Sequence, residues 1–229
     1  MPFSPRFLAL VWLASAFGVV PLRAAEPAAG HSTHGEAFNE GPRQQAVLMD
    51  GLPRLKFEIT TSKPLAQRFF LQGIAQLHGF WYWEAERSFR QAAAYDPGCA
   101  MAYWGMAMAN VNNDKRAKAF LVNAVGGKED VTPRERQWIE MLENFYRDDK
   151  RDAKQRTLDC IRDLETLVQE FPEDVEAKAF LVWKIWQGKD KAPISSPMAV
   201  NALLDQIFAA DPDHPAHHYR IHLWDGFKP

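Results

Sequence analysis

Residues 64–108 read PLAQRFFLQGIAQLHGFWYWEAERSFRQAAAYDPGCAMAYWGMAM, and this stretch decides the fold. Its apolar residues recur at the spacing of two amphipathic helices joined by an aromatic-rich turn. Small side chains at Gly73 and Ala85 allow these helices to approach closely, and Phe89 fills the space around the contact. Asp96-Pro97 ends the second helix, because proline lacks the backbone N–H that the helical ladder needs. The stretch therefore predicts an antiparallel helical hairpin followed by the start of another.

The same pattern continues toward the C-terminus. Helix-terminating prolines stand at positions 97, 172 and 212, and each is followed by a further amphipathic helix. Between them, Thr132 is a natural N-cap, with Pro133 at the first helical position and Glu135 placed to complete a capping box. We therefore expect an all-α fold. Its predicted architecture is a right-handed solenoid of helical hairpins of the tetratricopeptide-repeat (TPR) type over residues 64–229.

Four motifs carry a resemblance to a known family. They are AQRFFLQG at 66–73, EAERSFRQA at 84–92, DPGCAMAYWG at 96–105 and HPAHHYRIH at 214–222. In this order they resemble the N-terminal part of a family of exported bacterial TPR proteins. The resemblance implies a repeat scaffold and no established reaction.

Proteins of this family usually continue with further helical pairs. A repeat stack needs a polar cap over its last apolar face, and Leu223, Trp224 and Phe227 do not supply one. We therefore expect either a truncated product or a partner that covers this end.

The N-terminal residues divide into two segments. Arg6 precedes an uncharged run over residues 7–22, and small residues follow at Ala24 and Ala25. This order predicts a secretory signal peptide over residues 1–25, and so a periplasmic or secreted protein that is not stably inserted in the membrane after cleavage. An uncleaved N-terminal anchor is the alternative. Residues 26–63 are predicted to form a flexible arm.

Within the arm, Leu55-Lys56-Phe57-Glu58-Ile59 alternates apolar and charged side chains. Such alternation is typical of a short extended piece. We expect this piece to lie against the first helix.

Composition excludes one class of partner. The 229 residues include 27 basic and 29 acidic side chains, for a net charge of −2. No basic excess is present to neutralise phosphates, so we do not expect nucleic acid to bind. The two cysteines, Cys99 and Cys160, are predicted to be small buried side chains, with a disulfide as the alternative.

The sharpest candidate site is a histidine cluster near the C-terminus. His218, His222 and Asp225 share one helical face, and His214 extends the row just before the helix. Two imidazoles four residues apart can bind one divalent transition metal, such as Zn, Cu or Fe, with the carboxylate as a third ligand. The alternative is that these histidines pack as repeat residues.

A second candidate surface is the concave groove of the repeats, which would bind a protein or peptide partner. Tyr103 and Asn110 are predicted to project into it, and Trp81 and Trp83 to form an aromatic ledge or, as the alternative, to pack under the arm. The sequence carries no catalytic motif, which favours a binding protein over an enzyme. The predicted function is a partner-binding exported scaffold, and metal binding is the alternative.

Overall fold

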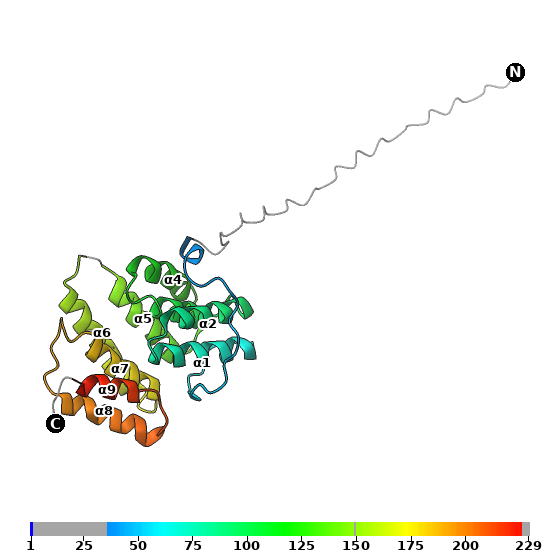
Figure 1. Ribbon diagram of the computed structural model, residues 1–229. Helices are drawn as coiled ribbons and strands as arrows, with labels where there is room; N and C mark the ends of the chain where they lie inside the picture. The colour runs from blue at the N-terminus through cyan, green and yellow to red at the C-terminus, as the bar shows by residue number, and fades with distance from the viewer. Residues whose placement is uncertain (2–35, 149, 226–229) are drawn as a thin grey trace.

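The computed structural model describes residue 1 and residues 36–148 and 150–225 (Figure 1). Every regular element in these residues is helical, which confirms the all-α expectation for them. The elements are η1 (Glu36–Asn39), α1 (Pro64–His78), α2 (Tyr82–Tyr95), α3 (Ala100–Met108), α4 (Asp114–Gly126), η2 (Lys128–Asp130), α5 (Pro133–Tyr146), α6 (Ala153–Glu170), α7 (Val175–Gln187), α8 (Pro197–Ala210) and α9 (His217–Trp224). The expected signal peptide, apart from residue 1, lies outside the described residues, as does Phe227.

Helices that follow one another in sequence pack against one another, from α1 on α2 through to α8 on α9. In addition, α1 contacts α3, α3 contacts α5 and α7 contacts α9. Figure 1 shows α7, α8 and α9 gathered at one end of the molecule. None of the described helices is long and apolar enough to cross a membrane.

The predicted close contact in the first hairpin is present. A β-carbon at Gly73 would lie 2.5 Å from Cε1 of Phe89, and one at Gly105 would also collide with that ring. Phe89 is fully buried between the two glycines, so it holds α2 against both α1 and α3. Only hydrogen at these two positions leaves room for the ring.

The predicted helix boundaries are confirmed. Thr132 accepts a hydrogen bond from the backbone N–H of Glu135, and the Glu135 carboxylate accepts one from the N–H of Thr132, which completes the capping box at the start of α5. Helices α2, α6 and α8 end two residues before Pro97, Pro172 and Pro212. The sequence signals for starting and stopping a helix therefore act locally here.

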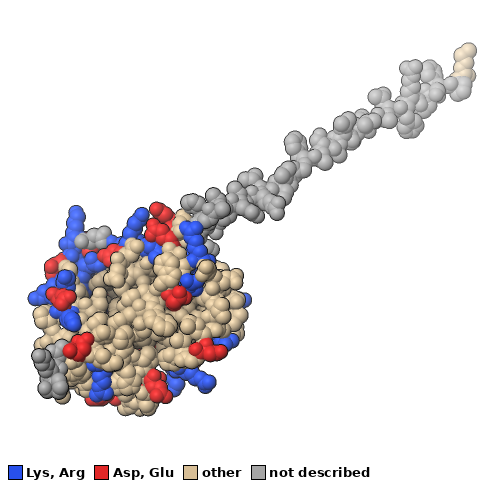
Figure 2. All heavy atoms as spheres, in the orientation of Figure 1, with Lys and Arg blue, Asp and Glu red and all other residues tan. Residues whose placement is uncertain are grey.

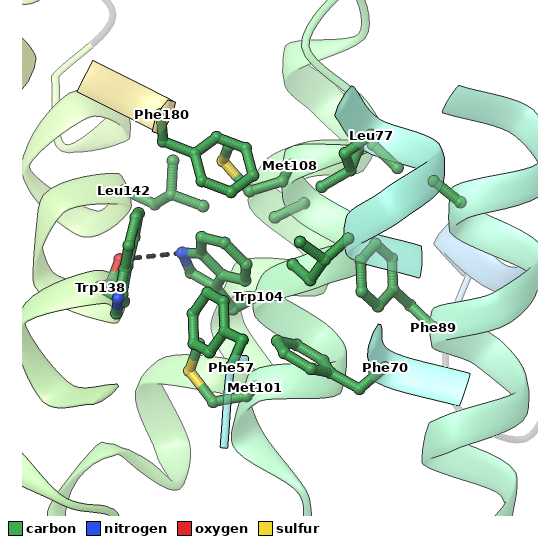
Figure 3. Packing of buried hydrophobic residues seen from close by; sticks show 14 of the residues in the cluster. Phe57, Phe70, Leu77, Phe89, Met101, Trp104, Met108, Trp138, Leu142 and Phe180 are labelled. Atoms are coloured by element: carbon green, nitrogen blue, oxygen red, sulfur yellow. Dashed lines mark hydrogen bonds between the residues drawn. The ribbon is translucent and has the colours of Figure 1, made fainter. Parts of the chain in front are cut away.

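Aromatic side chains fill the centre of the core. Trp104 from α3 and Trp138 from α5 are fully buried, and Phe180 from α7 packs edge-on against both rings. The indole N–H of Trp104 donates to the backbone oxygen of Trp138 at 2.9 Å (Figure 3). This bond satisfies a polar group that would otherwise be costly to bury.

The described part of the arm lies against the helices. Leu55, Phe57 and Ile59 are buried, whereas Lys56 and Glu58 are exposed, as the alternation predicts. Further toward the N-terminus, the guanidinium groups of two arginines donate to backbone oxygens of residues 37–40. These donors are Arg90 and Arg116, which both pair with the carboxylate of buried Glu86.

Cys99 and Cys160 are both free and buried, in agreement with the packing prediction. Burial raises the pKa of each thiol to about 11. At the surface, lysine, arginine, aspartate and glutamate are interspersed on the face shown in Figure 2. That face carries no extended region of one sign.

Candidate histidine site on α9

Helix α9 brings two histidine side chains together. His218 and His222 lie one turn apart, and their Nε2 atoms are 3.0 Å from each other. Both side chains are half-buried, because α9 packs on α7 and α8 through Tyr219 and Leu223. The predicted pairing at positions i and i+4 therefore places two imidazole nitrogens at one point.

The other ring nitrogen of each histidine fixes which atom carries the proton. Nδ1 of His218 lies 2.8 Å from the backbone oxygen of His78, which can only accept a hydrogen bond. Nδ1 of His222 lies 3.2 Å from the carboxylate of Asp225, which also accepts. Both Nδ1 atoms are therefore N–H donors, and in the neutral rings both Nε2 atoms carry lone pairs.

Two lone pairs facing each other at 3.0 Å repel unless a cation lies between them. A shared proton or a metal ion would serve. With metal–nitrogen bonds of about 2.05 Å, donors at this separation subtend about 94° at the metal. That angle matches the cis positions of square-planar or octahedral coordination, and opening the separation to about 3.3 Å gives a tetrahedral one.

Aromatic rings surround the histidine pair. The ring of Phe80 lies 4.3 Å from that of His218, and the ring of Trp186 lies 4.8 Å from that of His222. Phe80 has a φ of 58°, in the left-handed region that costs a non-glycine residue about 1–2 kcal/mol. Its ring stacks on those of Trp186 and His222.

A pocket of about 300 Å³ opens beside the pair. His222 and Asp225 from the α9 end line it, together with Trp186, Lys189, Pro193, Ile194, Pro197 and Leu223. An ion held by the two Nε2 atoms would therefore have a cavity of small-molecule size next to it.

The fourth predicted ligand, His214, belongs to a separate and fully buried cluster. Its Nε2 lies 3.1 Å from one oxygen of Glu176, and Nε2 of His78 lies 2.7 Å from the other oxygen. Nδ1 of His78 lies 2.6 Å from the hydroxyl of Tyr219. Helix α7, helix α1 and the turn before α9 thus meet at one carboxylate, and Tyr219 of α9 joins the cluster through His78.

This buried cluster satisfies its own hydrogen bonds. Nδ1 of His214 accepts the backbone N–H of Ala216 at 3.1 Å, so Nε2 of His214 carries the proton that Glu176 accepts. Burial lowers the pKa of His78, whose neutral ring donates to Glu176 and accepts from Tyr219. A metal bound at His214 Nε2 would need that proton removed, while the Ala216 N–H blocks its transfer to Nδ1.

The same donors keep Glu176 ionised. Burial raises the pKa of this carboxyl. The electrostatic interaction with His78 and the hydrogen bonds from both histidines lower the pKa by more, to about 2. His78, Glu176 and His214 have ligand-type atoms within 4.8 Å of one another, yet the proton positions favour a hydrogen-bonded brace over a metal site.

The chain was compared with family models, curated proteins and solved structures. Nothing matches.

The predicted groove residues differ in their exposure to solvent. Trp81 and Trp83 are exposed, at 53% and 56%. Tyr103 and Asn110 are buried, and neither side chain is exposed as the two tryptophans are. The reason is the arm, since Phe38 packs edge-on against Tyr103, while Asn110 is held by Glu86 and by an arginine that binds the arm.

Of the predicted metal set, the structure groups His218, His222 and Asp225 and separates His214. Asp225 lies on the Nδ1 side of His222, where it orients the ring and does not face the converging Nε2 atoms. Sequence reasoning missed His78, Glu176 and Tyr219, because the residues they contact lie 38 to 141 positions away in the chain. The aromatic residues that follow His78 in sequence were the one local feature that drew attention to this region.

Proposed function

We propose that this protein binds a divalent transition-metal ion between His218 and His222. One observation carries the proposal: the two Nε2 atoms lie 3.0 Å apart, and Nδ1 of each ring lies against a hydrogen-bond acceptor. Metal-binding histidines commonly donate their second nitrogen to a backbone carbonyl or a carboxylate. His78 O and Asp225 supply one of each.

The donor atoms limit which metal ions the site would bind. Imidazole nitrogen suits Zn²⁺, Cu²⁺ and iron, and among divalent ions the affinity order places Cu²⁺ highest. Because the chain supplies two donors here, further coordination positions are left for water or for a small ligand entering the adjacent pocket.

The setting of the site is also a proposal. We infer a TPR-like right-handed solenoid, which the packing of sequential helices and the contacts α1–α3, α3–α5 and α7–α9 support. Export to the periplasm or outside the cell is supported by the order of residues 1–25. In such an oxidising compartment Cu²⁺ is available as the divalent ion.

Elemental analysis tests the proposal. Untagged wild-type protein, loaded with Cu²⁺ or Zn²⁺ and desalted, is expected to retain about one equivalent, and His218→Ala/His222→Ala none. His217→Ala is the matched control, because His217 lies on the same helix but bonds to the backbone oxygen of Pro212. Wild-type protein that retains no metal would show that a shared proton, not an ion, lies between the rings. Equal loss in the His217 variant would also contradict the assignment.

A further inference from the structure

Residues 54–60 form an extended segment that lies on helices instead of in a sheet. The segment has no regular secondary structure, yet its side chains alternate strictly between buried and exposed. Leu55, Phe57 and Ile59 are 7%, 1% and 8% exposed. This is the side-chain pattern of a strand, on a surface built by α1, α3 and α5.

Side chains of the helices satisfy the backbone of this segment. The amide group of Gln67 donates to the oxygen of Phe57 at 2.9 Å and accepts from the N–H of Ile59 at 3.0 Å. The N–H of Thr60 donates to the Glu135 carboxylate at 2.6 Å. An adjacent strand would make the same pair of bonds, to a C=O and to the N–H two residues on.

The arrangement occurs a second time along the arm. The amide of Gln72 donates to the oxygen of Val47 at 3.0 Å and accepts from the N–H of Met49 at 2.8 Å. Two glutamines five residues apart on α1 thus bind two extended pieces in the same register. Between the two pieces Gly51 has a φ of +81°, which lets the chain turn from one glutamine to the other.

One aromatic side chain anchors the segment. The ring of Phe57 lies 5.1 Å from that of Phe70, 5.5 Å from that of Trp138 and 6.0 Å from that of Trp104. Figure 3 shows the ring of Phe57 beside Trp104 and Met101. The guanidinium of Arg134 covers Phe57 at 4.2 Å and donates to the backbone oxygen of Glu58.

Space for a longer ligand continues beside the segment. An open cavity of about 740 Å³ runs between residues 55–58 and the turn from α6 to α7. Gln67 and Arg134, which bind the segment, also line this cavity, together with the apolar Leu71 and Phe171.

We propose that the α1–α3–α5 face is an extended-peptide-binding groove that residues 46–60 of the same chain occupy. Its external partner is an extended protein segment with a phenylalanine flanked, two residues away on each side, by aliphatic residues. Gln67 and Gln72 would hydrogen-bond to the backbone of such a ligand, and the pocket of Phe70, Trp104 and Trp138 would bind its phenylalanine ring. A partner binds by displacing the arm, so the arm keeps the groove closed until a competing segment arrives.

A peptide in trans tests this proposal. Phe57→Asp places a charge in the aromatic pocket and is expected to release the arm, while Lys56→Asp puts the same charge at an exposed neighbouring position and leaves the arm bound. A fluorescent peptide LPRLKFEITTS, residues 52–62, is expected to bind Phe57→Asp at least about tenfold more tightly than Lys56→Asp or wild type. Fluorescence anisotropy measures the affinity.

Two controls separate specific binding from hydrophobic adhesion. A peptide with Phe and Glu exchanged, LPRLKEFITTS, moves the ring to the opposite face and is expected not to bind. Adding Gln67→Ala to the Phe57→Asp chain removes both backbone bonds and is expected to weaken the peptide about tenfold or more. Equal binding of both peptides, or no binding to a Phe57→Asp chain that circular dichroism shows to be folded, would overturn the proposal.

Hydrogen exchange of the wild-type chain is the second measurement, should Phe57→Asp fail to fold. The amides of Ile59 and Thr60 are expected to exchange by local opening, faster than the α1 amides, because a displaceable arm opens without the helices. Exchange of both sets at one common rate would make the arm a fixed part of the core and overturn the proposal. If the wild-type protein forms a concentration-dependent dimer by exchanging arms, the arm of one chain occupies the groove of another, and the proposal that each arm occupies its own groove is overturned.

Discussion

Replacing Glu176 with glutamine perturbs the buried cluster without changing its size. The wild-type carboxylate accepts one N–H from His78 and one from His214, each on a different oxygen. Glutamine keeps one accepting oxygen and puts an NH₂ group where the other stood. A histidine N–H would then face an amide N–H in a site with no exposure to solvent, so one donor on each side loses its partner.

Two estimates of these same interactions give a similar magnitude. Loss of a hydrogen bond to a charged group, with a buried donor left unpaired, costs about 3 kcal/mol. The pKa of Glu176 falls from 4.5 to about 2 on folding, which corresponds to about 3 kcal/mol of stability. Because the folded pKa is depressed, this contribution is complete above pH 4.5 and is lost as the pH falls from 4.5 toward 2.

Thermal unfolding at pH 7 is the assay. For a chain of this length we expect Glu176→Gln to lower Tm by about 6–12 °C. Glu173→Gln removes an exposed carboxylate one turn earlier and is expected to change Tm by less than about 2 °C. Below pH 4.5 the wild type should lose stability more steeply than Glu176→Gln. Equal Tm values for the two variants, or identical pH slopes, would refute the brace.

Three further predictions concern the metal site, the first hairpin and the thiols. Asp225→Asn removes the anionic acceptor of His222 Nδ1 and is expected to weaken Cu²⁺ or Zn²⁺ binding about 10–100-fold in a chelator competition. An unchanged metal affinity would show that Asp225 does not orient the His222 ring. Gly73→Ala places a methyl group against Phe89 and should lower the free energy of unfolding in urea by about 1–3 kcal/mol. Gly126→Ala, with open space around it, should leave the stability unchanged or raise it. A larger loss of stability in Gly126→Ala than in Gly73→Ala would refute the packing. Cys99 and Cys160, with pKa values raised to about 11, should resist iodoacetamide at pH 8 until guanidinium unfolds the chain, and rapid native alkylation would contradict their burial.

Local signals predicted the helical elements well. Thr132 with Glu135, and the prolines at 97, 172 and 212, act within a few residues of where they stand, so their effect could be read directly from the chain. The glycine at position 73 was also readable, because a helical hairpin brings Phe89 back to it within a short loop.

Long-range contacts account for what the sequence did not reveal. The alternation of residues 55–59 predicted an extended piece, but periodicity does not say which surface the buried side chains meet, and Phe57 reached the centre of the core. The burial of Tyr103 and Asn110 has the same origin, since the arm that covers them is distant in sequence. His214 was predicted to join the α9 histidines by helical phase, but the N–H of Ala216 turns its Nε2 toward Glu176.

The most direct test of the metal site is ¹H–¹⁵N NMR of the imidazole nitrogens, before and after one equivalent of Zn²⁺. The geometry predicts that both Nδ1 atoms of His218 and His222 are protonated throughout, and that both Nε2 resonances shift together when Zn²⁺ is added. The nitrogens of His78 and His214 are expected to stay unchanged in the same spectra. An Nε2 proton on His218 or His222 that persists at one equivalent of Zn²⁺ would contradict the proposed site.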